Sequence, residues 1–300
     1  MLPFYTAGKA LLYIKEIEQG DTVFIDMHPS NVCNHACIWC RFPHDKKSLS
    51  YTDMVWFLDR YPYLKGIRLS GGGEPLMNPD TIPFIEECVR RGIVVGLFTN
   101  GSLINESNIP TIAKCTFCRI SLDAFTAQTH RITHHTQDFN KILSNINDLA
   151  YAGIKQLGIS FMVTDETVED IPLVNSTYIS SLPVNYFNFK PLISGISDKT
   201  KETALAYLRT AEHNHRITIN YTRIIEDTYA NTGILCRITR IIKGVAADGC
   251  VYACCEHSYE PEYNVDMWDG DNSKCRNCVY NGYNEILDMY YTNSISKECL

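Results

Sequence analysis

The chain has 300 residues, 45% of them apolar, which is enough to bury one large α/β core with or without a small additional domain. Its 27 basic and 34 acidic side chains give a net charge of −7, which argues against a nucleic-acid binder that works through a basic surface. No run approaches the roughly 18 apolar residues of a membrane span, and charged residues interrupt positions 1–32, which therefore do not form a secretory signal peptide.

Six short runs rich in Val, Ile, Leu and Phe predict β-strands that are buried on both faces. They lie at 22–27, 66–70, 94–99, 118–122, 156–163 and 184–190. Stretches with apolar residues three or four positions apart alternate with them and predict helices. These lie at 53–59, 79–91, 138–152 and 166–180. This alternation predicts an α/β fold with a parallel sheet and right-handed crossovers, curled into a partial (β/α)6 TIM-like barrel. We expect the chemistry at the carboxyl ends of its strands.

The rest of the chain is predicted to differ from this barrel. A helix near 199–211 and a strand at 216–222 lead into a loop-rich end with few long apolar runs, which would need a metal or a cluster to hold it together. We therefore predict three parts, in chain order. They are a partial barrel at 1–195, a connecting helix and strand at 196–235, and a small cysteine-rich domain at 236–300.

Thirteen cysteines are many for a chain without an export signal, which we expect to be cytoplasmic. Their odd number does not fit a fully paired set of disulfides. Three of them lie within 33–40 and six within 236–278, while none lies between 119 and 235. This distribution favours two sites of metal or cluster ligation over disulfides.

The first group follows the first predicted strand as Cys33, Cys37 and Cys40, in a C-x3-C-x2-C pattern. At the cysteine content of this chain, the expected number of chance occurrences of this spacing is only about 0.02. Cysteine thiolates are the usual ligands of iron–sulfur clusters, and three of them on a four-iron cube leave one iron open to a small molecule. The alternative is a zinc site completed by His35 or His44.

This cysteine pattern, with Trp39 before the last cysteine, resembles the signature of the radical S-adenosylmethionine (radical SAM) enzymes. In that family the amino and carboxylate groups of S-adenosylmethionine chelate the open iron. An electron from the cluster then cleaves the sulfonium and releases a 5′-deoxyadenosyl radical, which abstracts hydrogen from a substrate. The resemblance therefore implies a site-differentiated [4Fe–4S] cluster, S-adenosylmethionine, and a reductant of the flavodoxin or ferredoxin type.

Motifs at the ends of the next strands support the resemblance. Gly72, Gly73 and Glu74 look like the family's Gly-Gly-Glu element, which holds the methionyl amino group. Glycines allow the backbone to approach a ligand closely, and a carboxylate accepts hydrogen bonds from an ammonium group. Asn100, in the turn after the third strand, is a polar lining candidate.

The fourth strand ends in a stretch that resembles the Ser-Leu-Asp element of family members with additional clusters. Ser121 and Asp123 alternate with Leu122, so both could face into the barrel and bind the ribose or the methionyl end. Arg131 could pair with the methionyl carboxylate, or it could be a solvated surface arginine.

Other cysteines and histidines of the barrel are not assigned to a cofactor. Cys115 and Cys118 have no second pair nearby, so we predict core thiols, and we predict that Cys88 packs in the same core. The histidines at 134–135 have no companion ligands in the sequence and are predicted to be polar surface.

The second cysteine group resembles the twitch form of the SPASM-type extension, which holds one auxiliary iron–sulfur cluster. Asp248 and Gly249 predict a hairpin turn with cysteines at its far end. The ligands predicted for an auxiliary cluster, expected to be [4Fe–4S], are Cys236, Cys254, Cys275 and Cys278. Cys250 and Cys255 compete for the place given to Cys254, and a four-cysteine zinc knuckle is the alternative.

The outcome of radical chemistry depends on the step that follows hydrogen abstraction. Loss of a further electron to the auxiliary cluster would give oxidation or a cross-link, whereas hydrogen donation from Cys250 or Cys255 would give epimerisation. The resemblance favours a ribosomally made peptide as substrate. The alternatives are a sugar, an aminocyclitol, a nucleotide or another natural-product intermediate, and, more distantly, a zinc- or iron–sulfur-binding protein without catalysis.

Overall fold

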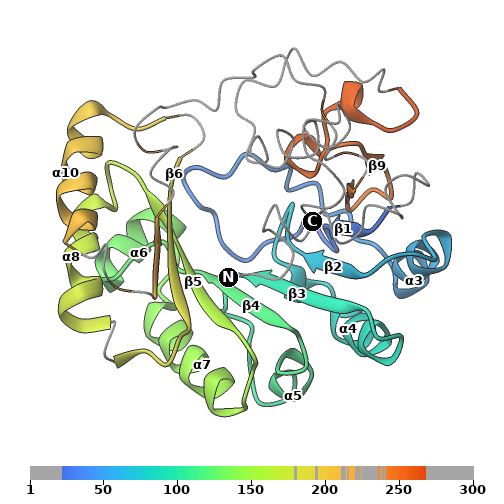
Figure 1. Ribbon diagram of the computed structural model, residues 1–300, viewed down its shortest axis with the longest axis horizontal. Helices are drawn as coiled ribbons and strands as arrows, with labels where there is room; N and C mark the ends of the chain where they lie inside the picture. The colour runs from blue at the N-terminus through green and yellow to red at the C-terminus, as the bar shows by residue number, and fades with distance from the viewer. Residues whose placement is uncertain are drawn as a thin grey trace, which may run out of the picture.

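The structure is a computed structural model that describes residues 22–178, 181–192, 195–210, 214, 216–219, 224, 236, 239 and 241–267. Its described strands form one sheet in the order β7-β6-β5-β4-β3-β2-β1-β8-β9 (Figure 1). They are β1 Phe24–Met27, β2 Gly66–Leu69, β3 Val94–Thr99, β4 Phe117–Ser121, β5 Leu157–Val163, β6 Tyr186–Pro191, β7 Ile217–Ile219, β8 Ile242–Val245 and β9 Val251–Tyr252.

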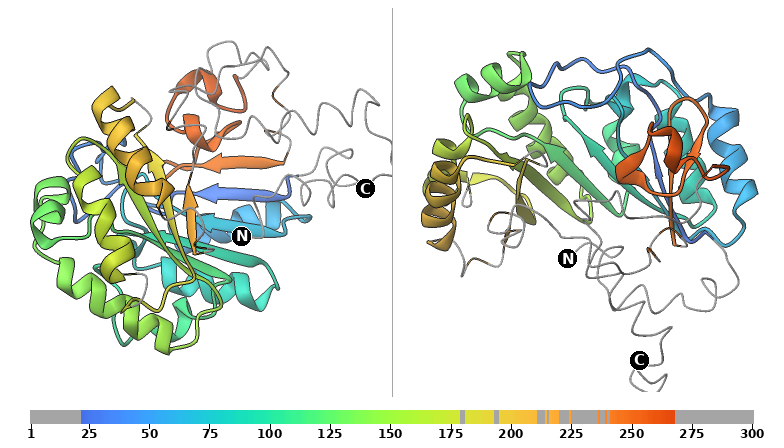
Figure 2. Two further views of the ribbon diagram at one scale, coloured as in Figure 1. Left: turned by 60° about the vertical axis from the view of Figure 1, so that its left-hand side comes forward. Right: turned by 90° about the horizontal axis from the view of Figure 1, so that it is seen from above.

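All neighbouring strands from β7 to β8 are parallel, and only β9 is antiparallel to its neighbour. The order ends at β7 on one side and at β9 on the other, so the sheet is open. This arrangement confirms the predicted α/β class with a partial, TIM-like barrel. It also places β8 beside β1, although more than 200 residues separate the two strands in the chain (Figure 2).

The described helices are α3 Tyr51–Arg60, α4 Thr81–Arg90, α5 Ile109–Ile112, α6 Ala127–His134, α7 Phe139–Tyr151, α8 Ile171–Leu173 and α10 Asp198–Arg209. Those near 53–59, 79–91, 138–152 and 199–211 were predicted, whereas α5 and α6 were not. The segment predicted as one helix at 166–180 is helical over residues 168–178, but in three consecutive pieces of different type: a 3-10 turn at Val168–Asp170, α8, and a π-helical turn at Val174–Tyr178. Pro172 lies in the first turn of α8, where its missing N–H is tolerated.

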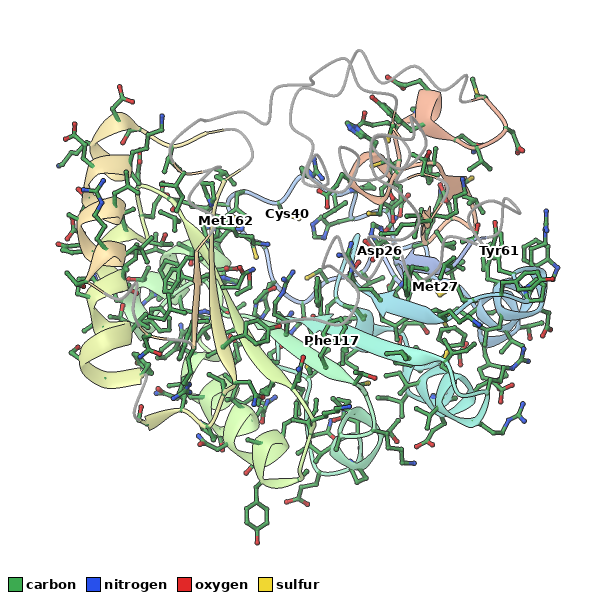
Figure 3. The ribbon with its side chains drawn as sticks, viewed as in Figure 1. Asp26, Met27, Cys40, Tyr61, Phe117 and Met162 are labelled. Atoms are coloured by element: carbon green, nitrogen blue, oxygen red, sulfur yellow. The ribbon has the colours of Figure 1, made fainter. Side chains whose placement is uncertain are left out.

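The two faces of the sheet differ in chemistry. Residues in register across a parallel sheet project to the same side, and one such row is fully apolar. It consists of Met27, Leu69, Leu97, Cys118 and Leu157, which lie in the core with the apolar sides of the surrounding helices. The opposite, inner face carries polar side chains. These include Asp26, which is labelled in Figure 3, and, by strand register, Arg68, Arg119, Ser121, Ser160 and Asn188.

The cysteines that were predicted to be core thiols are core thiols. Cys88, Cys115 and Cys118 are buried within the apolar layer between sheet and helices. Burial raises the pKa of each of them, because an ionised thiolate would lose its hydration there. They therefore contribute packing rather than reactivity.

The predicted hairpin around Asp248 and Gly249 is present between β8 and β9. The Gly249 N–H donates to the Ala246 carbonyl at 3.0 Å, and Gly249 has φ +82°, a conformation that glycine adopts without steric cost. Cys254 and Cys255 follow β9, as expected. The segment 268–300, with the predicted ligands Cys275 and Cys278, lies outside the described residues.

The three predicted parts contribute to one sheet. β7 comes from the predicted connecting segment and β8 from the predicted cysteine-rich domain, and each pairs with a strand of the barrel. The boundaries at 195 and 235 stay predictions. In the described part of the chain, every helix is too short or too polar to cross a lipid bilayer.

Candidate active site

The loop with the first three cysteines follows β1 at the carboxyl edge of the sheet. Its beginning runs along the glycine turn after β2, where the Gly73 N–H donates to the Ser30 carbonyl and the Glu74 N–H to the Val32 carbonyl, both at 2.8 Å. Its middle is held by the end of α6, because the Ala36 N–H donates to the His134 carbonyl at 3.2 Å. These hydrogen bonds fix the cysteine loop from two sides.

The glycine turn can lie this close only because it has no side chains. A Cβ on Gly72 would lie 2.0 Å from Asn31 Oδ1, and a Cβ on Gly73 would lie 2.2 Å from the Val32 carbonyl oxygen. These distances are far below van der Waals contact. Gly72 and Gly73, predicted to approach a ligand, therefore also allow the cysteine loop to dock.

The three thiols lie close enough to affect one another electrostatically. Burial raises the pKa of Cys33 and Cys37, and nearby negative charge, including that of Cys40, raises both further. Three thiolates would thus repel one another unless a cation neutralised them. An iron–sulfur cluster supplies that positive charge, and the His35 N–H already donates to Cys33 Sγ at 3.4 Å. The donor set therefore fits a cluster with three cysteine ligands.

The two histidines that could complete a zinc site have different neighbours. His44 Nε2 lies 3.4 Å from Cys40 Sγ, close to the cysteine group. The His35 ring instead contacts His134 and Asp138. His35 is thus engaged in hydrogen bonds on both ring nitrogens and does not complete a zinc site with the cysteines.

Glu74 connects the ends of β2 and β3. Its Oε1 accepts hydrogen bonds from Thr99 Oγ1 at 2.6 Å and from the Leu76 N–H at 3.1 Å, and its Oε2 accepts from the Asn100 N–H at 2.7 Å. A carboxylate has about four lone-pair positions, so Oε2 can accept one further donor. The predicted bond from a ligand ammonium is compatible with this capacity.

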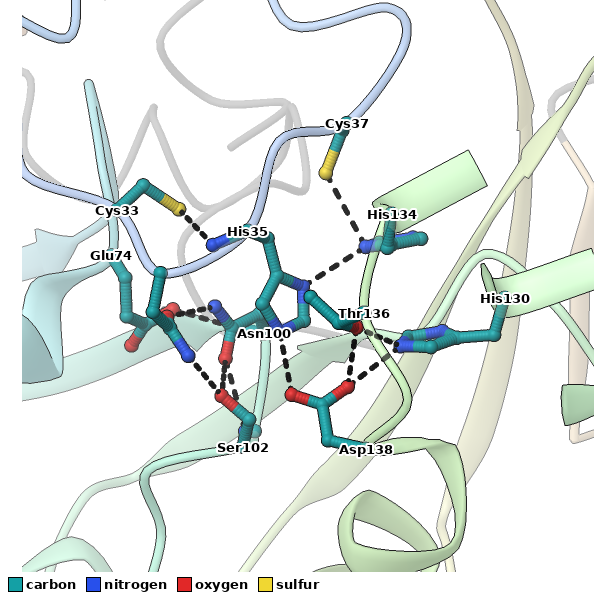
Figure 4. Close-up of polar contacts among 12 residues, drawn as sticks. Cys33, His35, Cys37, Glu74, Asn100, Ser102, His130, His134, Thr136 and Asp138 are labelled. Atoms are coloured by element: carbon teal, nitrogen blue, oxygen red, sulfur yellow. Dashed lines mark hydrogen bonds and ion pairs between the residues drawn. The ribbon is translucent and has the colours of Figure 1, made fainter. Parts of the chain in front are cut away.

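Asn100 orients the cysteine loop through Asn34. The Asn100 Nδ2 group donates to Asn34 Oδ1 at 2.9 Å, and Asn34 Nδ2 donates to Ser102 Oγ at 2.8 Å (Figure 4). Ser102 in turn donates to Asn100 Oδ1 at 2.7 Å. The predicted lining residue is therefore fixed within a closed hydrogen-bonded group.

Ser121 and Asp123 lie at the end of β4, near the cysteine loop. Ser121 shares the inner face of the sheet with Ser160, its partner in register. Asp123 is buried, and its Oδ1 accepts the Met162 N–H at 2.7 Å, while Oδ2 lies 3.6 Å from His134 Nε2. Contact of Ser121 or Asp123 with S-adenosylmethionine stays a prediction.

Trp39 and Arg131 lie in different environments. The half-buried Trp39 ring meets the His134 ring edge to face, with centroids 5.8 Å apart. Arg131 lies on the exposed side of α6, which agrees with the surface alternative. Its pairing with the methionyl carboxylate stays a prediction.

A buried histidine cluster beside the cysteine loop was not predicted. His134, expected at the surface, is only 1% exposed, and its Nδ1 lies 3.3 Å from Cys37 Sγ (Figure 4). His35 and His130 lie next to it, with one nitrogen of each ring within 4.8 Å of the others. The i, i+4 spacing of His130 and His134 places both on one side of a helix and was the available sequence signal.

The described cysteines of the second group gather around the β8–β9 hairpin. Cys236 is half-buried and lies near Lys243, whose pKa is lowered by burial. The pKa of Cys254 is raised, first by a hydrogen bond with Cys255 and then by burial. Cys255 is 5% exposed and lies 3.7 Å from Arg68 Nη2 on the inner face of the sheet. Which of these thiols ligates a cluster stays a prediction.

Tyr259 connects this C-terminal region to the cysteine loop. Its hydroxyl donates to Asn31 Oδ1, lies 3.3 Å from His28 Nδ1, and accepts the Ala247 N–H at 3.3 Å. Arg41 adds a second connection by donating to the Glu256 carbonyl at 2.9 Å. The two cysteine regions are therefore joined by polar contacts.

His28 makes the stability of this junction depend on pH. Burial, with a smaller contribution from the positive charge of Arg41, lowers its pKa from 6.5 to about 4. The unfolded chain therefore takes up a proton near pH 6.5 that the folded chain refuses until about pH 4, so stability falls as the pH decreases through that window. Between pH 7 and pH 5 we expect His28 to account for a loss of about 2 kcal/mol.

Urea unfolding of the chain and of His28→Gln at both pH values measures this contribution. The wild type should lose about 2 kcal/mol more than the variant on going from pH 7 to pH 5. Equal losses in the two proteins would show that His28 is not the responsible group.

Comparisons with known proteins agree with this geometry. The sequence profile of the Radical SAM superfamily matches residues 27–174. The tungsten-containing aldehyde ferredoxin oxidoreductase cofactor-modifying protein of Pyrococcus furiosus is 26% identical over 167 residues, covering 51% of this chain and 47% of that protein. The mycofactocin maturase MftC of Mycobacterium ulcerans is 28% identical over 144 residues, covering 45% and 38%. This chain thus matches less than half the length of each of these two relatives.

Among solved structures, Streptococcus suis SuiB bound to the precursor peptide SuiA is similar in fold. Its TM-score is 0.65 at 16% sequence identity, and the match covers 92% of this chain and 71% of that one. The matched sequence region contains the three-cysteine loop, the glycine turn and the end of β4, the elements that the structure brings to one edge of the sheet. Residues 27–174 of this chain therefore belong to the radical SAM superfamily.

Proposed function

We propose that this protein is a radical SAM oxidoreductase that abstracts hydrogen from a peptide substrate. Cys33, Cys37 and Cys40 would hold a [4Fe–4S] cluster, and S-adenosylmethionine would bind at its open iron. These groups supply a one-electron cleavage of the sulfonium, which yields methionine and a 5′-deoxyadenosyl radical. A flavodoxin- or ferredoxin-type protein is proposed as the source of the electron.

The observation that carries the proposal is the placement of the three thiols. One loop holds them at the carboxyl ends of the parallel strands, between the glycine turn at 71–73 and α6. Glu74 and Asn100 lie against the same loop, with their orientation fixed by hydrogen bonds. A preorganised polar site of this kind can bind and orient a charged cofactor without rearrangement.

A peptide is proposed as the substrate because of what the relatives' names state. The Mycobacterium ulcerans relative is a mycofactocin maturase, and the SuiB structure contains a precursor peptide. The polar inner face of the sheet, with Ser160 and Asn188 beyond Ser121, gives a peptide backbone groups to hydrogen-bond.

An auxiliary cluster near the hairpin is part of the proposal. Cys236 and Cys254 would be two of its ligands, with Cys275 and Cys278 completing the set. Cys255 is the more suitable of the two proposed hydrogen donors, because it contacts Arg68 on the inner face, whereas Cys250 lies in the hairpin turn.

Anaerobic reconstitution with iron and sulfide, followed by dithionite and S-adenosylmethionine, tests the proposal. We expect 5′-deoxyadenosine to form, and about eight iron atoms per chain if both clusters are cubanes. A chain that carries a loaded cluster at the first three cysteines but forms no 5′-deoxyadenosine would contradict the enzymatic proposal. About four iron atoms together with one zinc would instead support the zinc knuckle at the second cysteine group.

A further inference from the structure

A line of hydrogen-bonding groups leads from Asp138 to a cluster ligand. Asp138 Oδ2 lies 2.9 Å from His35 Nε2, and His35 Nδ1 lies 3.2 Å from His134 Nδ1. His134 Nδ1 in turn lies 3.3 Å from Cys37 Sγ (Figure 4). All three contacts are between side chains, and both histidines are buried.

The Asp138 end of this line is a carboxylate. Burial alone would raise the pKa of Asp138, but the hydrogen bonds from Thr136, His130 and His35 act in the opposite direction, and the pKa lies below its ordinary value. Thr136 Oγ1 donates to Oδ1 at 2.6 Å, and His130 Nε2 lies 3.0 Å from the same oxygen. An ionised carboxylate only accepts hydrogen bonds, so the proton of His35 lies on Nε2.

The position of the His35 proton determines which nitrogen carries the proton between His35 and His134. A neutral His35 with its proton on Nε2 has a lone pair on Nδ1 and accepts a hydrogen bond there. The proton between the two histidines therefore lies on His134 Nδ1. Cys37 leads to the same result, since a cysteine that ligates a cluster is a thiolate and has no proton to donate. The His134 Nδ1–H thus faces both His35 Nδ1 and Cys37 Sγ.

The same three histidines do not present a metal site. Both nitrogens of His35 are engaged with Asp138 and His134, and those of His130 with Asp138 and the Leu122 carbonyl, the latter at 3.3 Å. Of the six ring nitrogens in these three described residues, only His134 Nε2 lacks a hydrogen-bond partner, and it faces the Asp123 carboxylate instead of the other rings. The lone pairs therefore do not converge on one point, as ligation would require.

We propose that His134 is a positioning residue that sets the reduction potential of the cluster through an N–H···S hydrogen bond to Cys37. Asp138, through His35, keeps the proton on the nitrogen that faces the sulfur. The inference rests on the proposed function, because it needs a cluster at Cys33, Cys37 and Cys40. A hydrogen bond to a ligand sulfur stabilises the more negative, reduced state of a cluster, so its loss makes reduction harder.

The midpoint potential of the cluster, followed by electron paramagnetic resonance in the absence of S-adenosylmethionine and substrate, measures this effect. Two clusters are proposed, so the signal of the one at Cys33, Cys37 and Cys40 must be identified. It is the signal that disappears when all three cysteines are replaced by alanine. In His134→Leu we expect the equilibrium constant for one-electron reduction to fall about tenfold, a midpoint about 59 mV more negative. His134→Asn should retain the wild-type potential, since its amide presents an N–H near the place of Nδ1.

A double-variant cycle tests the role of Asp138. Asp138→Asn should lower the potential when His134 is present, because His35 is then free to present an N–H to His134. The same substitution in the His134→Asn background should leave the potential unchanged, since an amide nitrogen always carries its protons. The neighbouring exposed His135, at φ +56°, supplies the control His135→Asn, which should not shift the potential.

Three results would overturn the inference while leaving the proposed function intact. They are an unchanged potential in His134→Leu, equal shifts in the Leu and Asn variants, and an Asp138→Asn shift that is the same in both backgrounds. The inference would also be overturned if the triple alanine variant bound one zinc per chain and the additional substitution His134→Leu abolished that binding. The histidine nitrogens would then ligate a metal. A wild-type chain that assembles no cluster at the three cysteines would overturn the proposed function and this inference together.

Discussion

Replacing Cys33, Cys37 and Cys40 with alanine is expected to reduce 5′-deoxyadenosine formation at least about 1,000-fold, to the background level. Without the cluster the site has no electron donor for the sulfonium, and the remaining residues only bind and orient. The three thiols are exposed or half-buried, so their removal leaves the core intact. Product formation by liquid chromatography and iron per chain, each with dithionite as reductant, give the measurement.

Cys115→Ala is the matched control for this prediction. The thiol is 2% exposed and packs in the apolar core, away from the loop at 33–40. Its loss should cost about 1–2 kcal/mol of stability through the cavity it leaves and should keep both the iron content and the cleavage of S-adenosylmethionine. Cleavage that persists in the triple variant would move the site to other cysteines, the group at 236–278 first.

The strands that were predicted are those whose own residues specify them. β3 and β5 are mostly apolar and almost wholly buried, and a short run of this kind has few alternatives to a doubly buried strand. β8 was not predicted, because its four residues include Lys243 and Gly244 and carry no such pattern. It is a strand because it pairs with β1, a contact between distant parts of the chain that local sequence does not encode.

The helix α6, at the candidate active site, is another element that local sequence does not predict. Its buried positions carry two histidines and a threonine, a composition that does not predict an amphipathic helix. The helix begins with the Thr126 side chain accepting the Thr129 N–H, and its end contacts the cysteine loop. Polar residues are buried there because they bond to one another across the fold.

The cysteine pattern and the glycine turn could be predicted because their spacing is local. The environment of His134 could not, since the ring is buried against His35, 99 residues earlier in the chain. Polar groups can be buried when each finds a partner, and the partner here comes from another element. Arg131, whose positive charge suggested a pairing with the methionyl carboxylate, lies on the exposed side of the same helix.

The glycine turn and the cysteine loop depend on each other sterically, so Gly73→Ala is expected to have the second large effect. The new Cβ would lie 2.2 Å from the Val32 carbonyl oxygen and 2.6 Å from the Asn31 carbonyl carbon, both of them backbone atoms. The loop must then move, and the hydrogen bonds from Gly73 to Ser30 and from Glu74 to Val32 lengthen or break. We expect a loss of about 2–4 kcal/mol of stability and at least about a tenfold loss of S-adenosylmethionine cleavage.

Gly153→Ala separates this steric effect from an ordinary glycine substitution. Gly153 has φ +84°, and a Cβ added to it would have no atom within 4 Å, so alanine there is strained only in its backbone. That strain costs about 1–2 kcal/mol, while the iron content and the cleavage rate should equal those of the wild type. Urea unfolding, iron per chain and 5′-deoxyadenosine formation are compared for the two variants. If Gly73→Ala kept full iron content and the full cleavage rate, the glycine turn would not be what positions the cluster loop, and Asn100 and α6 would suffice to hold it.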